Sequence, residues 1–162
     1  MKLIVVESPA KAKKIQTFFN KNVIVRSSFG HINGLDTGKL DEMIEKDFTP
    51  IYKISNPKVV EALKSVKTSD IVLAADDDRE GDAIAWHTGN LFKLDYKKNN
   101  RIKFNEISKK AILNALENPT TLDMNSVNAQ RARQFIDLYI GYKVSPLLWK
   151  HIQTDKKGLS AG

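Results

Sequence analysis

Short apolar runs alternate with amphipathic segments along residues 2–117 of the chain. Runs rich in β-branched residues are typical of buried strands, because a strand that is covered on both faces carries no regular polar positions. Such strands are predicted at residues 2–6, 22–28, 70–75 and 101–104. The helical segments between them imply βαβ units, so we expect an α/β fold with a mainly parallel sheet flanked by helices.

Helices are predicted where apolar residues recur every three or four positions. Ser8 and the proline that follows it are typical of an N-cap and a first helical position, and they open a helix over residues 9–19. A second helix is predicted over residues 57–66, and Ser108 caps a third over residues 109–117.

The stretch before the helix over residues 57–66 follows neither period. Two glycines predict a tight loop at residues 29–35. Residues 36–56 are expected to be irregular, with an apolar island at residues 48–52 that packs on the core. We treat residues 35–66 as an excursion of the first domain toward the second.

Toward the C-terminus the pattern changes to helix without strand. A helix is predicted over residues 127–140, ending at Gly141, with an apolar stripe of Ala132, Phe135, Ile136 and Tyr139. We therefore divide the chain into a first domain, residues 1–122, and the opening of a helical second domain, residues 123–162. The basic stretch at residues 156–162 has no terminating element, so we expect a flexible, truncated end.

Charge is distributed unevenly along the sequence. Residues 76–82 hold five carboxylates and one arginine, a net −4, so the rest of a chain with a total of +7 carries +11. A basic body around an acidic segment suits a polyanion that approaches through a bound cation, and nucleic acid is the commonest such partner. Lys11, at the start of a predicted helix, opposes the helix dipole and suggests a bound anion, whereas Lys13 and Lys14 are interpreted as a solvated face.

The absence of cysteine excludes a disulfide framework, thiolate zinc sites and a catalytic thiol. No apolar run approaches the ~20 residues that are needed to span a bilayer, and residues 1–7 are too short and too soon acidic for a signal peptide. We therefore expect a cytoplasmic, nucleoid-associated monomer with no membrane partner.

The acidic segment directly follows the predicted strand at residues 70–75 and precedes a helical pattern that begins at Ala83. If the segment is extended, the two-residue period of a strand places Asp76, Asp78 and Glu80 on one side. Carboxylates that converge repel one another, so a cation has to compensate them, and a site of oxygen ligands alone suits Mg²⁺. Two alternatives stay open: an EF-hand, although its twelfth position would be a histidine here, and a solvated acidic turn.

Further polar residues have candidate roles around this segment. Glu7 and Asp76 both follow predicted strands, and ligands of such sheets bind beyond the carboxyl ends of the strands, so we expect these two carboxylates in one crevice. His31 either contacts a phosphate or caps a turn. Arg131 and Arg133 lie off the predicted apolar stripe, and they either grip phosphates or are solvated.

Six segments, taken together and in order, strongly resemble the type IA DNA topoisomerases, and among them bacterial topoisomerase I. They are LIVVESPAKAK at residues 3–13, GHI at 30–32, DDDREGDAIAWH at 76–87, FNEI at 104–107, VNAQRAR at 127–133 and GLSA at 158–161. The acidic segment alone points only to the wider Toprim group, which includes primases and nucleases. One departure is Asp82, where the family usually has glutamate.

The resemblance implies a Rossmann-like Toprim domain, followed by the opening of a helical domain that grips single-stranded DNA. Enzymes of this family relax negatively supercoiled DNA without ATP: a tyrosine cleaves one strand as a 5′-phosphotyrosine, another strand passes, and a Mg²⁺-assisted step reseals the break. By motif position that tyrosine is none of Tyr52, Tyr96, Tyr139 and Tyr142. The resemblance therefore implies an amino-terminal fragment that is inactive alone and works with other domains of its polypeptide.

The resemblance also suggests individual roles. Glu7 is the expected proton shuttle, and Lys11 is expected to stabilise charge on the transferred phosphoryl group. The expected Mg²⁺ ligands are Asp76, Asp78 and Glu80, with Glu7 as a further candidate. The expected DNA contacts are His31, Arg79, Arg131 and Arg133, where Arg79 pairs either with a phosphate or with the carboxylates. A stand-alone Toprim nuclease and a non-catalytic nucleic-acid-binding module are the alternatives, and the sequence does not distinguish topoisomerase I from topoisomerase III or reverse gyrase.

Overall fold

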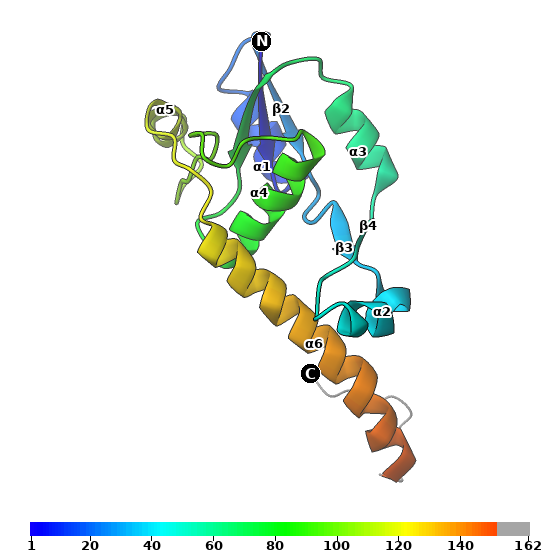
Figure 1. Ribbon diagram of the computed structural model, residues 1–162. Coiled ribbons are helices and arrows are strands. Elements are labelled where there is room, and N and C mark those ends of the chain that lie inside the picture. Colours follow the sequence, from blue (N-terminus) through cyan, green and yellow to red (C-terminus); the bar gives the residue numbers. More distant parts are fainter. Residues whose placement is uncertain (152–162) are drawn as a thin grey trace.

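Three parallel strands form the centre of the computed structural model, which describes residues 1–151. They are β1 (Lys2–Val6), β2 (Val23–Ser27) and β5 (Asp70–Ala74), in the order β2–β1–β5. Each residue of β1 is paired on both sides, as expected for the middle strand of a parallel sheet (Figure 1). The predicted α/β architecture is therefore confirmed.

Helices cover both faces of this sheet. Ile4 and Val6 point to the face covered by α1 (Pro9–Gln16) and α5 (Lys109–Glu117). Leu3 and Val5 point to the other face, covered by α3 (Pro57–Lys64) and α4 (Arg79–Leu91). Because successive strand residues alternate between two buried faces, the strands read as continuous apolar runs.

The predicted starts of the helices at residues 9, 57 and 109 are confirmed, whereas the helices expected from residues 83 and 127 begin earlier, at Arg79 and Met124. The second predicted helix ends at Lys64 rather than at residue 66. Ser8 accepts a hydrogen bond from the Lys11 amide at 3.3 Å, and Ser108 accepts one from the Ala111 amide at 3.1 Å, so both serines are N-caps. The first helix ends at Gln16 rather than at residue 19, because residues 17–19 form turns that pack Phe18 and Phe19 against the core.

The prediction that residues 36–56 are irregular is wrong. This stretch contains a 3-10 turn, Thr37–Lys39, and the helix α2, Leu40–Glu45. It ends in β4 (Tyr52–Ile54), which pairs with β3 (Asn33–Leu35) in a two-stranded antiparallel sheet. These elements are short, and they are held by a separate core of Leu35, Leu40, Met43 and Phe135, so no long periodic pattern marks them in the sequence.

The loop prediction around Gly30 and the apolar island need smaller corrections. Gly30 has φ of 83° and makes the expected turn, but the loop ends sooner than predicted because β3 begins at Asn33. In the apolar island Ile51 and Tyr52 pack on the core, whereas Phe48 stays 54% exposed.

The predicted strand at residues 101–104 is also wrong. Arg101 alone forms isolated bridges, a parallel one with Leu73 and an antiparallel one with Thr120. The segment lies where a fourth strand would stand, because the Ile102 amide donates to the Leu73 carbonyl at 2.9 Å. Pairing goes no further, since Ile102 and Phe104 instead enter the core between α1 and α5.

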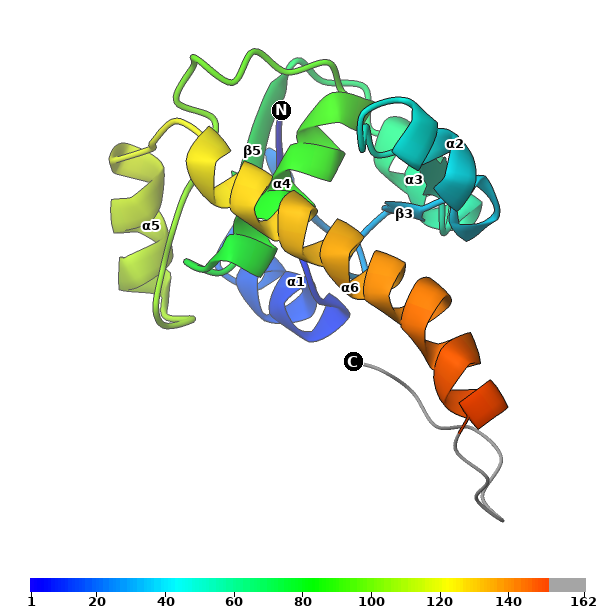
Figure 2. The same ribbon diagram turned by 60° about the horizontal axis from the view of Figure 1, so that its bottom comes forward.

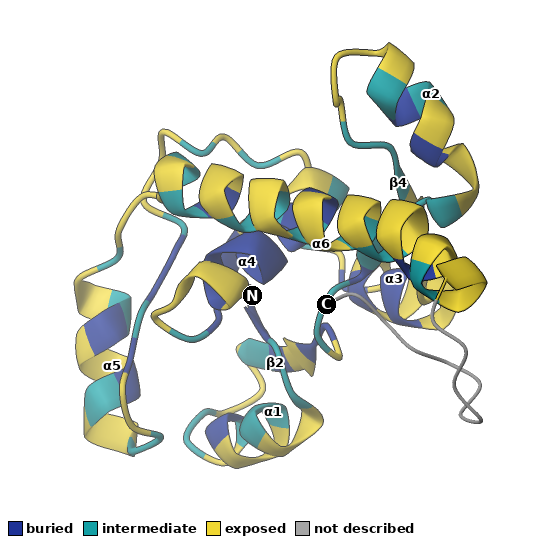
Figure 3. Cartoon of the chain, turned by 90° about the horizontal axis from the view of Figure 1, so that it is seen from below, coloured by how far each residue is buried: buried dark blue, intermediate teal, exposed yellow. Residues whose placement is uncertain are grey.

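The helix α6 (Met124–His151) is much longer than predicted, and Gly141 does not end it. A glycine inside a helix costs only about 1 kcal/mol, so it is not a stop by itself. The helix packs against α4 near its start, and its far part leads away from the sheet (Figures 1 and 2). Of the predicted stripe only Phe135 is buried, and the far part of α6 exposes large apolar side chains (Figure 3).

Among residues 1–151, no helix is both long and apolar enough to cross a membrane. The GLSA segment at residues 158–161 and the whole predicted basic end at 156–162 lie outside the described part of the chain.

Candidate acidic active site

The candidate site lies at the carboxyl ends of β1 and β5. The chain leaves β1 toward β2 on one side and later returns to β5 on the other, so strand order reverses between β1 and β5, which is where α/β sheets open a crevice. Glu7 directly follows β1, and Asp76 follows β5 by two positions. The Nζ atom of Lys11, in the first turn of α1, forms ion pairs with both carboxylates. The expectation that Glu7 and Asp76 share a crevice is therefore confirmed.

The three charges stabilise one another. Burial by itself would lower the pKa of Lys11, but hydrogen bonds to Asp76 and Glu7 outweigh it and raise the pKa above the usual value. Burial by itself would raise the pKa of Asp76, but the hydrogen bond from Lys11 outweighs it and the net pKa is lowered. Lys11 therefore stays protonated and Asp76 ionised across the neutral pH range.

A cavity of about 410 Å³ opens over the crevice. Its lining comprises Lys11, three successive aspartates and residues 104–107: Lys11, Asp76, Asp77, Asp78, Phe104, Asn105, Glu106 and Ile107. Two segments that are far apart in the sequence, the acidic segment and the FNEI segment, thus form the walls of one cavity.

Residues 76–80 do not meet the condition of an extended backbone, because the chain turns into α4 at Arg79. Asp78 is the N-cap of this helix and accepts a hydrogen bond from the Gly81 amide at 2.6 Å. A Cβ atom at Gly81 would collide with the backbone carbonyl oxygen of Asp76, so the sharp turn depends on glycine. Glu80 stands in the first helical turn, and strand alternation does not relate it to Asp76.

Glu80 is bound by residues from two other parts of the chain. Its Oε1 atom lies 2.5 Å from Nε2 of His31, which is in the loop before β3. Its Oε2 atom accepts a hydrogen bond from the side-chain amide of Gln130, on α6. His31 thus contacts a carboxylate, neither of the partners expected for it. The contact of Gln130 with Glu80 was not predicted. The one sign of it in the sequence is that Gln130 belongs to the VNAQRAR segment.

A buried ion pair supports the crevice from behind. Arg101 is fully buried, and its guanidinium pairs with Asp82, which is 2% exposed, at 3.1 Å. The guanidinium also donates to the carbonyl oxygens of Ala75 and Asp76, at 2.7 and 2.6 Å. Burial lowers the pKa of Arg101, and the charge of Asp82 opposes this. The pair therefore fixes the backbone at the start of the acidic segment. This role of Arg101 was not predicted, because Arg101 was assigned to a strand.

The donors of the crevice suit Mg²⁺ in kind but are not assembled around one point. All the candidate ligands are carboxylates, the ligand type of a hard cation. Asp76 is bound to Lys11, and Asp78 gives one oxygen to the cap and keeps the other. Within residues 1–151, no three or more histidine, aspartate or glutamate side chains are grouped closely enough to hold a metal ion.

The arginines predicted to contact DNA lie in different surroundings. Arg79 is exposed at the start of α4, and Arg133 is exposed on α6, where it pairs with Asp137 at 3.6 Å. Arg131 packs between α6 and α4: its guanidinium lies 4.5 Å from the ring centroid of Trp86 and donates to Tyr52 and Asn128. Arg131 is thus only partly solvated, and it lies on the face of α6 that contacts α4.

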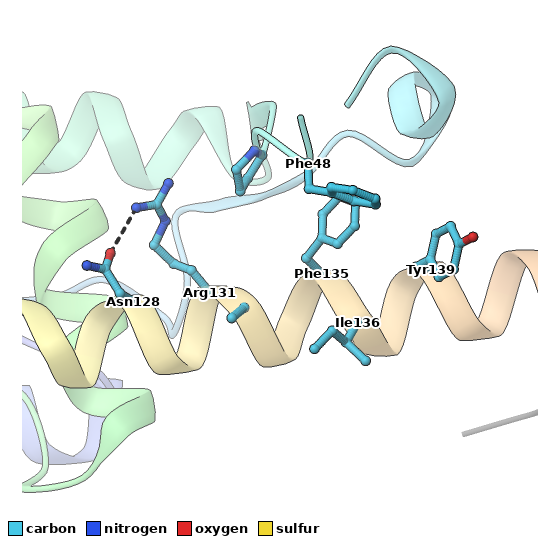
Figure 4. A pocket seen from close by; sticks show the side chains of 8 residues that line it. Phe48, Asn128, Arg131, Phe135, Ile136 and Tyr139 are labelled. Carbon is cyan, nitrogen blue, oxygen red and sulfur yellow. Dashed lines mark hydrogen bonds between the residues drawn. The ribbon is translucent and has the colours of Figure 1, made fainter. Parts of the chain in front are cut away.

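Arg131 also stands at one end of a second cavity of about 410 Å³, between α6 and the segment before β4 (Figure 4). Aromatic rings dominate its walls. Phe48 and Phe135 meet edge to face at 5.8 Å, and Phe135 stacks with Tyr139 at 6.4 Å. The predicted apolar stripe of α6 is therefore largely the wall of an open cavity.

Comparison with known proteins gives two findings. The Toprim domain family matches residues 2–107 of the chain. The structure of full-length topoisomerase I from Thermotoga maritima superposes with a TM-score of 0.87 and 43% sequence identity, over 99% of this chain and 28% of that protein. The chain thus spans little more than a quarter of the length of the topoisomerase that it resembles.

Proposed function

The chain belongs to the Toprim domain family, and from this membership and its likeness to topoisomerase I we propose that it is the metal-binding and DNA-binding part of a type IA DNA topoisomerase. The observation that carries the proposal is the contact of Lys11 with both Glu7 and Asp76 beneath an open cavity. A carboxylate that can move a proton and a fixed positive charge beside it supply two of the functions that phosphoryl transfer needs.

In this proposal Glu7 moves the proton of the 3′ oxygen. Cleavage of a DNA strand expels an alkoxide, which needs an acid, and resealing needs the same group as a base. Glu7 is half-buried at the end of β1 and held by Lys11, so its carboxylate is already oriented. Lys11 supplies positive charge for the phosphoryl oxygens.

The carboxylates Asp76 and Asp78 would hold Mg²⁺, with Glu80 completing the set and Glu7 as a further candidate. Mg²⁺ supplies charge neutralisation and orientation for phosphate oxygens. Asp78 keeps one carboxylate oxygen beyond the one that caps α4, and Asp76 lines the open cavity, which supports both assignments.

The cavity between α6 and Phe48 suits unpaired bases. Bases stack on aromatic side chains with little dependence on sequence, and a neighbouring arginine adds charge for the phosphate backbone. Phe48, Phe135 and Tyr139 line this cavity together with Arg131. Arg79, Arg133 and His31 are the remaining candidates for contacts with the backbone of single-stranded DNA.

The whole reaction belongs to the longer protein. We propose that its tyrosine lies outside this chain, that the complete polypeptide relaxes negatively supercoiled DNA, and that the chain alone binds DNA without cleaving it.

A binding and cleavage assay on the 162-residue chain tests the proposal. Titration calorimetry should show Mg²⁺ binding that Asp78→Asn weakens by about tenfold or more, since asparagine keeps the helix cap but removes the ligand charge. The matched control is Asp70→Asn, because Asp70 lies exposed at the opposite end of β5.

A labelled single-stranded oligonucleotide should bind and stay intact with Mg²⁺. Its hydrolysis without covalent attachment to protein would favour a stand-alone nuclease. Equal Mg²⁺ affinity of the wild type and Asp78→Asn would favour a non-catalytic nucleic-acid-binding module.

A further inference from the structure

Both carboxylate oxygens of Glu80 are occupied by side chains from outside the acidic segment. His31 binds Oε1, and the Gln130 amide donates to Oε2. The Glu80 side chain is 52% exposed, so solvent alone could satisfy it and burial does not force these contacts. Two separate elements, the loop before β3 and α6, nevertheless converge on this one carboxylate.

These contacts set Glu80 apart from the other candidate ligands. Asp76 is bound to Lys11, and Asp78 is bound to the amide of Gly81. Glu80 instead contacts His31 and Gln130, and no metal-competent group of three carboxylates is present among residues 1–151. Glu80 therefore has to move before three carboxylates can meet at one ion, and its contacts with His31 and Gln130 hold it where it lies.

The helix α6 is held firmly at Gln130, because it is anchored on both sides of this residue. Val127 is completely buried in the core between the sheet and α4. Arg131 stacks on Trp86 of α4 at 4.5 Å and donates to the hydroxyl of Tyr52 at 3.1 Å. The backbone of α6 at Gln130 is therefore fixed by packing, so α6 does not follow Glu80 freely.

We propose that Gln130 is a positioning residue which, together with His31, withholds Glu80 from the Mg²⁺ site. In this view the metal-free chain keeps Glu80 of α4 bound to α6, and recruitment of Glu80 to Mg²⁺ requires the hydrogen bond from the Gln130 side-chain amide to break. The inference rests on the proposed function, because it concerns the same metal site.

The sign of the effect makes the inference testable. Gln130→Met removes the amide but keeps side-chain length and helix propensity. Because Mg²⁺ no longer competes with this hydrogen bond, its affinity for the 162-residue chain should rise about three- to tenfold, the range expected for one partly exposed hydrogen bond to a carboxylate. General damage to the fold would lower the affinity instead.

The matched control is Gln134→Met. Gln134 lies one turn further along α6, half-buried like Gln130, and forms no contact with Glu80. Calorimetric titration with Mg²⁺ of both variants and the wild type should show tighter binding for Gln130→Met only. Circular dichroism at the same temperature checks that both variants keep the helical content of the wild type.

A double-mutant cycle isolates the pair. In a Glu80→Gln background, Gln130→Met should leave Mg²⁺ affinity unchanged, since the ligand that Gln130 withholds is already gone. Unchanged or weaker binding by the single variant Gln130→Met overturns the inference, and so does an equal gain in the Glu80→Gln background.

Failure of the inference and failure of the proposed function give different results. If Asp78→Asn weakens Mg²⁺ binding while Gln130→Met does not tighten it, only the role of Gln130 is overturned. If Asp78→Asn leaves Mg²⁺ binding unchanged, the metal site and the inference built on it are both overturned.

Discussion

The sheet domain and the far part of α6 have similarly apolar sequences but very different packing. In the sheet domain Leu3, Ile4 and Ile112 are fully buried between layers. On α6, Ile136 and Leu147 are 53% and 55% exposed. Figure 3 shows the far part of this helix as mostly exposed. The acidic crevice therefore stands on a complete core. The helix α6 is instead held by α4 near its start, by Phe135 in the small core with α2, and by the ion pair of Lys143 with Asp41 at 2.8 Å. The same substitution is expected to have different consequences in the two regions.

The largest difference in stability is expected between substitutions of two arginines, one in each region. Arg101→Met removes one partner of a buried ion pair and leaves Asp82 charged without its main partner, which should destabilise the chain by about 3–5 kcal/mol. Arg133→Met removes one partner of the exposed pair with Asp137 and should change stability by about 0.5 kcal/mol or less. Urea denaturation of both variants at pH 7.5 measures the difference.

The double variant Arg101→Met/Asp82→Leu is the control for the buried pair. It removes both charges, so it should recover much of the lost stability. If Arg101→Met and Arg133→Met proved equally mild, the buried pair would not be what fixes the β5–α4 loop.

How well each region could be predicted depends on how far apart in the sequence its interacting residues lie. The three strands of the parallel sheet and the caps Ser8 and Ser108 were predicted, because runs of apolar residues and local hydrogen bonds act within a few positions. The structure of residues 36–56 was missed, because its core depends on Phe135, which lies far along the chain.

Within the candidate site the same rule applies. The meeting of Glu7 and Asp76 followed from the general topology of parallel sheets, and it was predicted. The alternation of Asp76, Asp78 and Glu80 was wrong, because it assumed an extended backbone where Gly81 allows a helix to start. Gln130 was missed because its partner Glu80 is 50 positions away and no local pattern joins them.

A pH titration probes the junction between the two regions, where His87 lies 1% exposed. Burial, and then the charges of His31 and Arg131, lower the pKa of His87 from 6.5 to about 4. His87 therefore binds a proton near pH 6.5 in the unfolded chain but only near pH 4 in the folded chain. Stability from this group is full above pH 6.5 and is lost as the pH falls toward 4, by about 3 kcal/mol.

The variant His87→Phe separates this effect from the other titrating groups. The stability of the wild type minus that of the variant, measured by urea denaturation, should fall by about 3 kcal/mol between pH 7.5 and pH 4. A difference between wild type and His87→Phe that stays constant with pH would mean that His87 is not buried in its neutral form.

Alanine substitutions of two glycines inside helices are expected to change stability the least, and in opposite directions. Alanine is favoured over glycine in a helix by about 1 kcal/mol, so a helix alone would gain from either substitution. At Gly141 on α6 nothing lies within 4 Å of an added Cβ, and Gly141→Ala should stabilise the chain by about 1 kcal/mol. At Gly81 the added Cβ meets backbone atoms of Asp76, which cannot rotate away, and Gly81→Ala should destabilise the chain by about 1–3 kcal/mol. Thermal unfolding of the two variants checks the signs, and a stabilising Gly81→Ala would show that the acidic segment does not need the tight turn that now positions Asp76.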